Sequence, residues 1–275
     1  MGKDQTVLFH STIFGPIRSR RLGVSLGVNL LPNDGKICSF DCVYCEAGYN
    51  RQGFGTTGMP SRQQTRDDLK AKLEAMKAAG DSLDVITFSG NGEPTLHPDF
   101  AGIVDDVIAL RNEFYPNAKV SVLSNSTRIG DEKVAEALMR VDNNILKLDS
   151  ALDATVQLMN KPQQAAYTVE RTVGEMERFE GRMILQTMFL RGRVGECIIQ
   201  TMMLRGEHEG KVIDNTTDDE INALIDAYKK IAPKEVMLYS IDRSTPEENL
   251  KKVEIDELRK IAERFEAAGI KVQVN

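Results

Sequence analysis

The sequence contains no tryptophan, only three histidines and four cysteines, and no apolar run that approaches the length of a membrane span. Its opening stretch, MGKDQTVLFHSTIFGP, lacks the apolar core of a signal peptide. The few cysteines, most of them crowded together, do not fit the disulfide scaffold of a small secreted protein. We therefore expect a cytoplasmic protein without a membrane partner.

An excess of positive charge is also missing. The net charge is −6, which argues against a dominant phosphate-binding surface. Hydrophobic residues make up 41% and charged residues 28% of the 275-residue chain, as is usual for a soluble protein with a sizeable core. Since α/β barrels of this length fold as one unit, we predict a single domain over residues 1–275.

Strand and helix patterns alternate along most of the chain. Apolar runs predict strands at 24–30, 85–88, 120–123, 145–148, 236–241 and 272–274, and one that starts near residue 183. Amphipathic spacing predicts helices that begin near residues 65, 100, 133, 168 and 217, and a last helix that ends at residue 269. About six strand-then-helix units predict a parallel sheet wrapped partly or wholly into a barrel.

A short repeat interrupts this alternation. The segment ILQTMFLRG at 184–192 recurs as IIQTMMLRG at 198–206. We expect one copy to form a barrel strand and the other an extra strand or hairpin arm, and the pattern does not decide between them.

The segment ICSFDCVYCEAG, residues 37–48, holds three of the cysteines at offsets of four and three. A structural zinc ion normally needs four protein ligands, whereas an iron-sulfur cubane held by three thiolates keeps one iron open for another ligand. A zinc site and incidental buried cysteines stay open as alternatives. The candidates for a fourth zinc ligand are His10, His97 and Cys197.

Two motifs carry a family resemblance. The pattern Cys38-x3-Cys42-x-Tyr44-Cys45 resembles the cluster motif of the radical S-adenosylmethionine (SAM) superfamily. SGNGEPTLHP, residues 89–98, follows a predicted strand and resembles the Gly-Glu element of that superfamily. FGPIRSRRLGVSLGVNLLP, residues 14–32, is similar to a subgroup of small single-cluster iron-sulfur oxidoreductases labelled wyosine-synthase-like. The resemblance implies a partial (β/α)6 TIM-like barrel.

The resemblance also implies a chemistry. The three thiolates would hold a [4Fe-4S] cluster, and SAM would chelate its open iron. Reductive cleavage of SAM would give a 5'-deoxyadenosyl radical that abstracts hydrogen from an unidentified substrate, which is a small molecule, a nucleoside or tRNA, or a peptide. A reducing partner such as flavodoxin or ferredoxin would supply the electron.

Residue roles follow from the same resemblance. The SAM amino group would meet Asn91, Gly92 and Glu93, and the backbone around Tyr44 would contact adenine. Contacts to ribose or to the SAM carboxylate would come from Ser124 and Asn125.

Two further residues are candidates for the catalytic site. Asp149 lies just past a predicted strand end and could orient ribose or substrate. Gln186, or its counterpart Gln200 in the repeat, could point toward the cofactor, although a buried amide often serves only nearby backbone. The rival functions are a zinc-stapled binding module and an iron-sulfur electron-transfer or redox protein that does not cleave SAM.

Overall fold

The computed structural model describes residues 7–19, 22–179, 197–243 and 245–275. Its strands are β1 (Ile13–Ser19), β2 (Gly23–Val28), β3 (Val85–Phe88), β4 (Lys119–Ser124), β5 (Asn143–Lys147), β6 (Cys197–His208), β7 (Lys211–Asp214), β8 (Glu235–Ser240), β9 (Lys251–Lys252) and β10 (Val272–Val274). Its α-helices are α1 (Arg62–Ala79), α2 (Phe100–Phe114), α3 (Glu132–Arg140), α4 (Asp153–Met159), α5 (Val169–Met176), α6 (Asp218–Ile231) and α7 (Ile255–Ala267).

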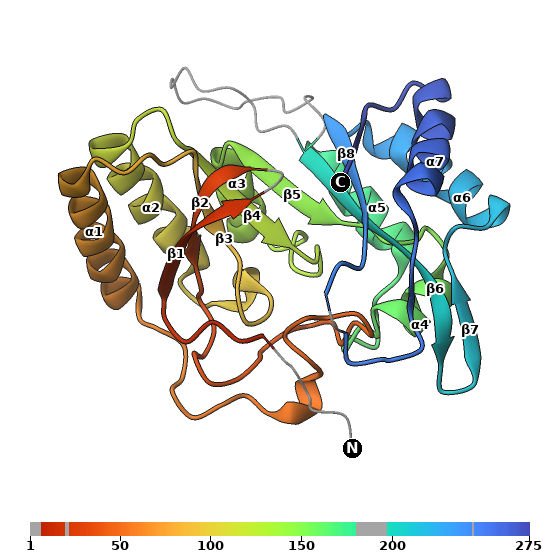
Figure 1. The fold of residues 1–275 in the computed structure, drawn as a ribbon, viewed down its shortest axis with the longest axis horizontal. Coiled ribbons are helices and arrows are strands. Elements are labelled where there is room, and N and C mark those ends of the chain that lie inside the picture. The colour runs from red at the N-terminus through yellow and green to blue at the C-terminus, as the bar shows by residue number, and fades with distance from the viewer. Residues whose placement is uncertain (1–6, 20–21, 180–196, 244) are drawn as a thin grey trace.

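The strands form one curved sheet in the order β1-β2-β3-β4-β5-β6-β8-β10 (Figure 1). Pairing is parallel from β2 to β10, and β1 adds an antiparallel strand at one edge. In the described residues β1 and β10 are the two edges, so the sheet is an open, partial barrel. This confirms the predicted fold class.

Helix α1 illustrates how local sequence sets the element bounds. The hydroxyl of Ser61 accepts a hydrogen bond from the Gln64 amide and caps the helix, and Gly80 ends it in the left-handed conformation that glycine adopts easily. The predicted helix start near residue 65 is therefore wrong by about one turn. Thr65 is buried inside the helix, where its hydroxyl donates to the Ser61 carbonyl.

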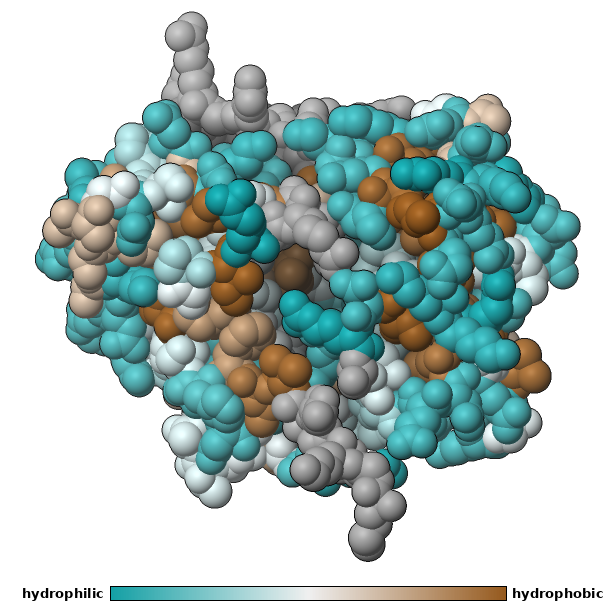
Figure 2. All heavy atoms as spheres, in the orientation of Figure 1, coloured by the Kyte–Doolittle hydropathy of each residue, from teal (hydrophilic) through white to brown (hydrophobic). Residues whose placement is uncertain are grey.

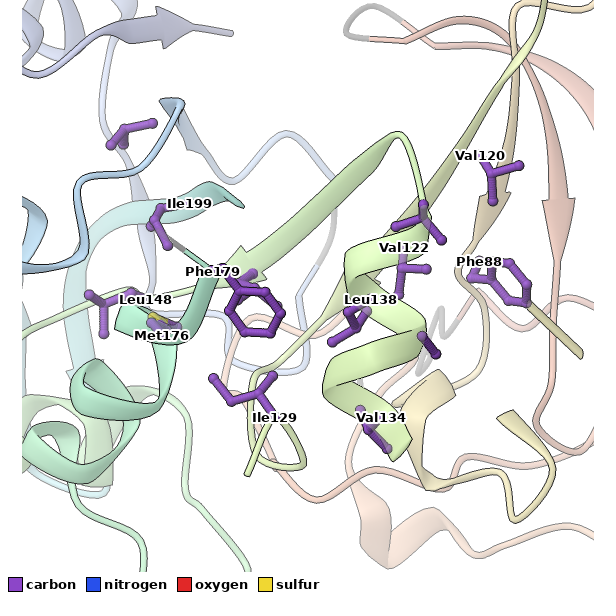
Figure 3. Packing of buried hydrophobic residues seen from close by; sticks show 14 of the residues in the cluster. Phe88, Val120, Val122, Ile129, Val134, Leu138, Leu148, Met176, Phe179 and Ile199 are labelled. Atoms are coloured by element: carbon purple, nitrogen blue, oxygen red, sulfur yellow. The ribbon is translucent and has the colours of Figure 1, made fainter. Parts of the chain in front are cut away.

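The main core lies between the sheet and the helices outside it. Figure 3 shows Phe88, Val120 and Val122 of the sheet facing apolar side chains of the surrounding helices and loops, among them Leu138 and Phe179. Each such side chain contributes about 1.5–3 kcal/mol when fully buried. Side chains alternate along a strand, so the residues between those buried on this face point into the barrel.

The structure describes the second copy of the repeat. The second copy, 198–206, lies within β6, which pairs in parallel with β5 and β8. Past residue 203 the same strand continues beyond the sheet and pairs antiparallel with β7 and β9. The first copy, and the strand predicted near residue 183, lie outside the described residues.

The loops that follow β2, β3, β4 and β5 emerge at the carboxyl ends of parallel strands, so they lie at one end of the sheet. On the face drawn in Figure 2, hydrophilic residues predominate and apolar ones form separate patches around a central hollow. In the described part of the chain, no helix has both the length and the apolar character that a membrane crossing requires.

Candidate functional site

The three clustered cysteines lie in residues 36–50, here called the cluster loop, which follows β2. The loop docks on the segment after β3 through a short parallel bridge between Ile37 and Gly92. The Ile37 amide donates to the Asn91 carbonyl at 3.1 Å, and the Glu93 amide donates to the Ile37 carbonyl at 3.0 Å. The cluster motif and the Gly-Glu element, separate in sequence, therefore form one structural unit.

Gly92 is the residue that permits this contact. Its φ is 139°, a conformation that side chains disfavour, and a Cβ atom at this position would lie 1.8 Å from the Ile37 carbonyl oxygen. Only glycine lets the two backbones approach this closely.

Amide side chains reach two of the three sulfur atoms. Cys42 is buried, and Cys38 and Cys45 are partly buried. The Asn125 amide lies 3.5 Å from the Cys38 sulfur, and the Asn160 amide lies 3.5 Å from the Cys42 sulfur. Both amides are placed to donate to thiolates, as the outer ligands of a metal site do.

Burial raises the pKa of both of these thiols when no metal is bound. The pKa of Cys38 rises to about 12, mainly through burial and then through neighbouring Cys42 and Glu93. That of Cys42 rises to about 11 through burial, although Lys147 opposes the rise. Because metal ligands must be deprotonated, binding a cationic centre would release protons here.

The Gly-Glu element is held by its own side chains. The Asn91 amide donates to the carbonyls of Phe9 and Pro32 at 2.9 and 2.8 Å, and its oxygen accepts from the Phe9 amide at 2.8 Å. The Glu93 carboxylate is buried and accepts from four groups, which are the amides of Thr95 and Asn125 and the hydroxyls of Thr95 and Ser124. Burial raises the pKa of Glu93 even though these hydrogen bonds oppose the rise. Both side chains are thus fully engaged within the protein.

A second polar network surrounds Asp149, which lies just past β5. The Tyr44 hydroxyl donates to its carboxylate, and so does the Asn160 amide at 2.6 Å. The Lys147 ammonium lies 3.0 Å from the Tyr44 hydroxyl and 3.6 Å from the Asp149 carboxylate. The other Asp149 oxygen accepts from the Met202 amide of β6 at 2.9 Å. Asp149 therefore joins the cluster loop to β5 and β6.

The contacts within this network set the protonation states of Lys147 and Tyr44. Burial would lower the pKa of Lys147, but Asp149 and other neighbours outweigh it, and the pKa is raised. Burial and Asp149 raise the pKa of Tyr44 well above its usual range. The network therefore holds a neutral phenol and a cationic lysine at neutral pH.

Lys36, at the start of the cluster loop, is buried with 2% of its surface exposed. Its ammonium donates to the Gly48 carbonyl at 2.6 Å and lies 3.6 Å from the Asp41 carboxylate. Burial acts to lower the pKa of Lys36, but the three cysteines and Asp41 outweigh it, so the pKa is raised.

The three thiols of the cluster loop match the donor set of an iron-sulfur cubane that keeps one iron open. In residues 7–19, 22–179, 197–243 and 245–275, no three histidine, cysteine or carboxylate side chains surround a single point as one metal ion requires. A cubane takes its three thiolates on separate irons. His97, a candidate zinc ligand, is buried with one ring nitrogen 2.8 Å from the Pro60 carbonyl and the other accepting from the Asp99 amide.

Most of the predicted site residues come together at the same end of the sheet. Hydrogen bonds and the bridge between Ile37 and Gly92 connect ten of them, with Cys45 joined through its amide, which donates to the Cys42 carbonyl at 3.1 Å. The ten are Cys38, Cys42, Tyr44, Cys45, Asn91, Gly92, Glu93, Ser124, Asn125 and Asp149. Gln186 lies outside the described residues. Its counterpart Gln200 lies in β6 and pairs with Lys147, so the two side chains share the inner face.

Sequence reasoning did not identify Lys36 and Asn160 as part of this site. Lys36 stands two residues before the first motif cysteine, and this proximity was a usable signal. Asn160 ends α4 and is 118 residues from Cys42, so no local pattern connects them.

A cavity of about 510 Å³ opens next to Tyr44 and Glu46 of the cluster loop. It extends from Arg18 of β1 to Arg243, which follows β8, and Asn275 also lines it. Near its rim Arg243 pairs with Glu46 at 2.7 Å. The Glu46 carbonyl also accepts from the Val7 amide at 2.9 Å, so the described N-terminal segment lies against this loop.

A parallel open barrel whose strand ends carry a C-x3-C-x2-C loop and a Gly-Glu element defines the class of radical SAM proteins. The family model for the radical SAM superfamily matches residues 33–204, and the chain belongs to this superfamily. This confirms the superfamily that the two motifs indicated.

The chain is also similar to individual known proteins. A UPF0026 protein of Methanocaldococcus jannaschii is 32% identical over 181 residues, covering 64% of this chain and 53% of that protein. A protein named GTPase Obg from Brachyspira hyodysenteriae is 26% identical over 268 residues, covering 96% of this chain and 35% of that protein. The crystal structure of a radical SAM methyltransferase from Sphaerobacter thermophilus covers 91% of this chain and 65% of its own at a TM-score of 0.65, with 14% identity. The chain spans only about a third to a half of these two curated relatives, and the structural likeness shows a shared fold.

Proposed function

We propose that this chain is the catalytic core of an enzyme that reductively cleaves SAM at a [4Fe-4S] cluster and abstracts hydrogen from a substrate. The observation that carries the proposal is the cluster loop itself, which presents three thiols beside the polar ends of β3, β4 and β5. When bound, the cluster and SAM supply the chemistry: one electron from a reductant such as flavodoxin or ferredoxin yields methionine and a 5'-deoxyadenosyl radical, which takes one hydrogen atom from the substrate.

The cluster would be held by Cys38, Cys42 and Cys45. The Asn125 and Asn160 amides would donate to the thiolates of the first two, since they already lie 3.5 Å from those sulfur atoms. Hydrogen bonds of this kind stabilise charge on sulfur and orient the ligands.

The Gly-Glu element would bind the SAM amino group through backbone carbonyls. The side chains of Asn91 and Glu93 are engaged inside the protein, and Gly92 has no side chain. Their role is then to hold that backbone rigid, which favours precise positioning of a cofactor. The adenine would lie along the backbone around Tyr44.

Ribose and carboxylate contacts fall to polar groups at the neighbouring strand ends. Ser124 ends β4 and Asn125 follows it. Asp149 follows β5, and its carboxylate is held by Tyr44 and Asn160. Gln200, the counterpart of Gln186 in the repeat, would contribute a glutamine on the inner face of β6.

The substrate would enter through the cavity next to Tyr44 and Glu46. Its volume of about 510 Å³ lies within the range of sites for small ligands. A small metabolite, a nucleoside or a side chain of a peptide would fit this space, and the charged rim formed by Arg18 and Arg243 favours a polar substrate.

The test is anaerobic reconstitution with iron and sulfide, followed by reduction with dithionite in the presence of SAM. We expect Cys38→Ala, Cys42→Ala and Cys45→Ala each to lose bound iron and the release of 5'-deoxyadenosine. Cys197→Ala is the matched control, because Cys197 begins β6 at the opposite end of the sheet and should leave both intact.

Other outcomes would identify the rival functions. A colourless protein with one zinc per chain would establish the binding module instead. A brown protein that holds iron and sulfide but releases neither 5'-deoxyadenosine nor methionine would establish the electron-transfer or redox protein.

A further inference from the structure

The cluster loop encloses one buried cation. The Lys36 ammonium donates to the carbonyl of Gly48, and the Gly48 amide in turn donates to the Cys45 carbonyl at 2.9 Å. Lys36 precedes the first ligand and Gly48 follows the last one, while Asp41, 3.6 Å from the ammonium, adjoins Cys42. The ammonium therefore lies within the turn of chain that carries all three thiols.

Burying a lysine is costly unless nearby negative charge compensates it. Asp41 supplies only part of that compensation, because its carboxylate lies 3.6 Å from the ammonium, beyond hydrogen-bond distance. Glu46, the other acid of the loop, is exposed toward Arg243. The remaining negative charge in the loop is that of the three cysteines once they are deprotonated to bind a cluster. Lys36 is therefore placed to compensate the negative charge of these thiolates.

A fixed positive charge beside a redox centre favours the state with the extra electron. In a site of low effective dielectric constant this effect is larger than in water, and the potentials of iron-sulfur clusters respond to net charge and to hydrogen bonds near the sulfurs. Two sulfurs already face amides, of Asn125 and Asn160. Lys36 adds a full charge from the side of the loop itself.

We propose that the Lys36 ammonium raises the reduction potential of the cluster that this loop holds, and so makes reduction easier for a biological donor. This rests on the proposed function, since it presumes a [4Fe-4S] cluster on the three cysteines. Lys36 would act on the cluster through its positive charge, without binding it.

The experiment is a potentiometric titration of the reconstituted protein without SAM, followed by electron paramagnetic resonance of the reduced cluster. Lys36→Met keeps the buried stem and removes the charge, and we expect a midpoint potential more negative than wild type at unchanged iron content. Lys36→Arg keeps the charge and should stay near the wild-type potential. Lys70→Met is the matched control, because Lys70 is 47% exposed on α1 and its loss removes the same charge far from the loop.

The outcomes separate this inference from the proposed function. A wild-type protein that assembles no [4Fe-4S] cluster refutes the proposed function before any variant is compared. A loaded Lys36→Met protein with the wild-type potential overturns only the role of Lys36. If Lys36→Met fails to load, Lys36→Gln takes its place. If both neutral variants fail to bind the cluster while Lys36→Arg binds it, the charge of Lys36 is needed for cluster assembly. This outcome also overturns the inference.

Discussion

The close backbone contact at Gly92 makes a quantitative prediction for Gly92→Ala. The added Cβ would lie 1.8 Å from the Ile37 carbonyl oxygen, so the cluster loop must move away. Two backbone hydrogen bonds between Ile37 and the Gly-Glu element would break, at about 1 kcal/mol each. The φ of 139° adds strain of about 1–3 kcal/mol for any residue with a side chain. We expect the free energy of unfolding to fall by roughly 3–5 kcal/mol.

The assay is urea unfolding of the metal-free protein, followed by far-ultraviolet circular dichroism. Gly174→Ala is the control, because Gly174 lies in α5 with open space where a Cβ would be placed. Alanine is the better helix former there and should stabilise the protein by about 0.5–1 kcal/mol. Equal urea midpoints for Gly92→Ala and wild type would refute the idea that the loop is docked through this contact. Iron loading after reconstitution should fall in the first variant and stay unchanged in the second.

Two more predictions concern side chains that connect elements. Asp106 of α2 accepts from Arg62 and Arg66 of α1, and the Arg62 hydrogen bond is the main cause that keeps the Asp106 pKa lowered. This stabilisation is present above the ordinary aspartate pKa of about 4 and is lost as pH falls through the lower folded value. Asp106→Asn should therefore cost about 1 kcal/mol at pH 7 and progressively less below pH of about 4, measured by urea unfolding across pH; a cost independent of pH would contradict the ion pair. Tyr228→Phe removes a buried hydrogen bond to Thr201 and should lower the free energy of unfolding by about 1 kcal/mol, seen as a lower thermal midpoint. Tyr115→Phe, at an exposed hydroxyl, should leave the thermal midpoint unchanged. Equal midpoints for the two variants would contradict the contribution of the buried hydrogen bond.

Much of the sheet was predictable because its strands are short, apolar and separated by amphipathic helices. The predicted bounds of β3 and β10 match those of the structure, and Thr168 and Thr217 cap helices where the sequence places a hydroxyl before an amphipathic run. Strand β1 was not predicted, since its segment of glycine, proline and arginine lacks an apolar alternation. The short helix α4 was also missed.

The sequence predicts the three thiols of the candidate site but not the side chains that surround them. Spacing alone brought out Cys38, Cys42 and Cys45, because a loop that wraps a cluster needs its thiols close together in sequence. The partners of these thiols come from other strands and helices, and Asn160 illustrates this distance. The place of the second copy of the repeat was equally undecidable, since both copies offer the same apolar pattern and only the structure shows that β6 pairs with β5 and β8.

The positions of the two described chain ends have a practical consequence. Val7 is bonded to the cluster loop through Glu46, and Asn275 lines the cavity beside that loop. A tag joined after Asn275 would start beside this cavity and would obstruct access to it. Purified protein is therefore best compared before and after removal of such a tag.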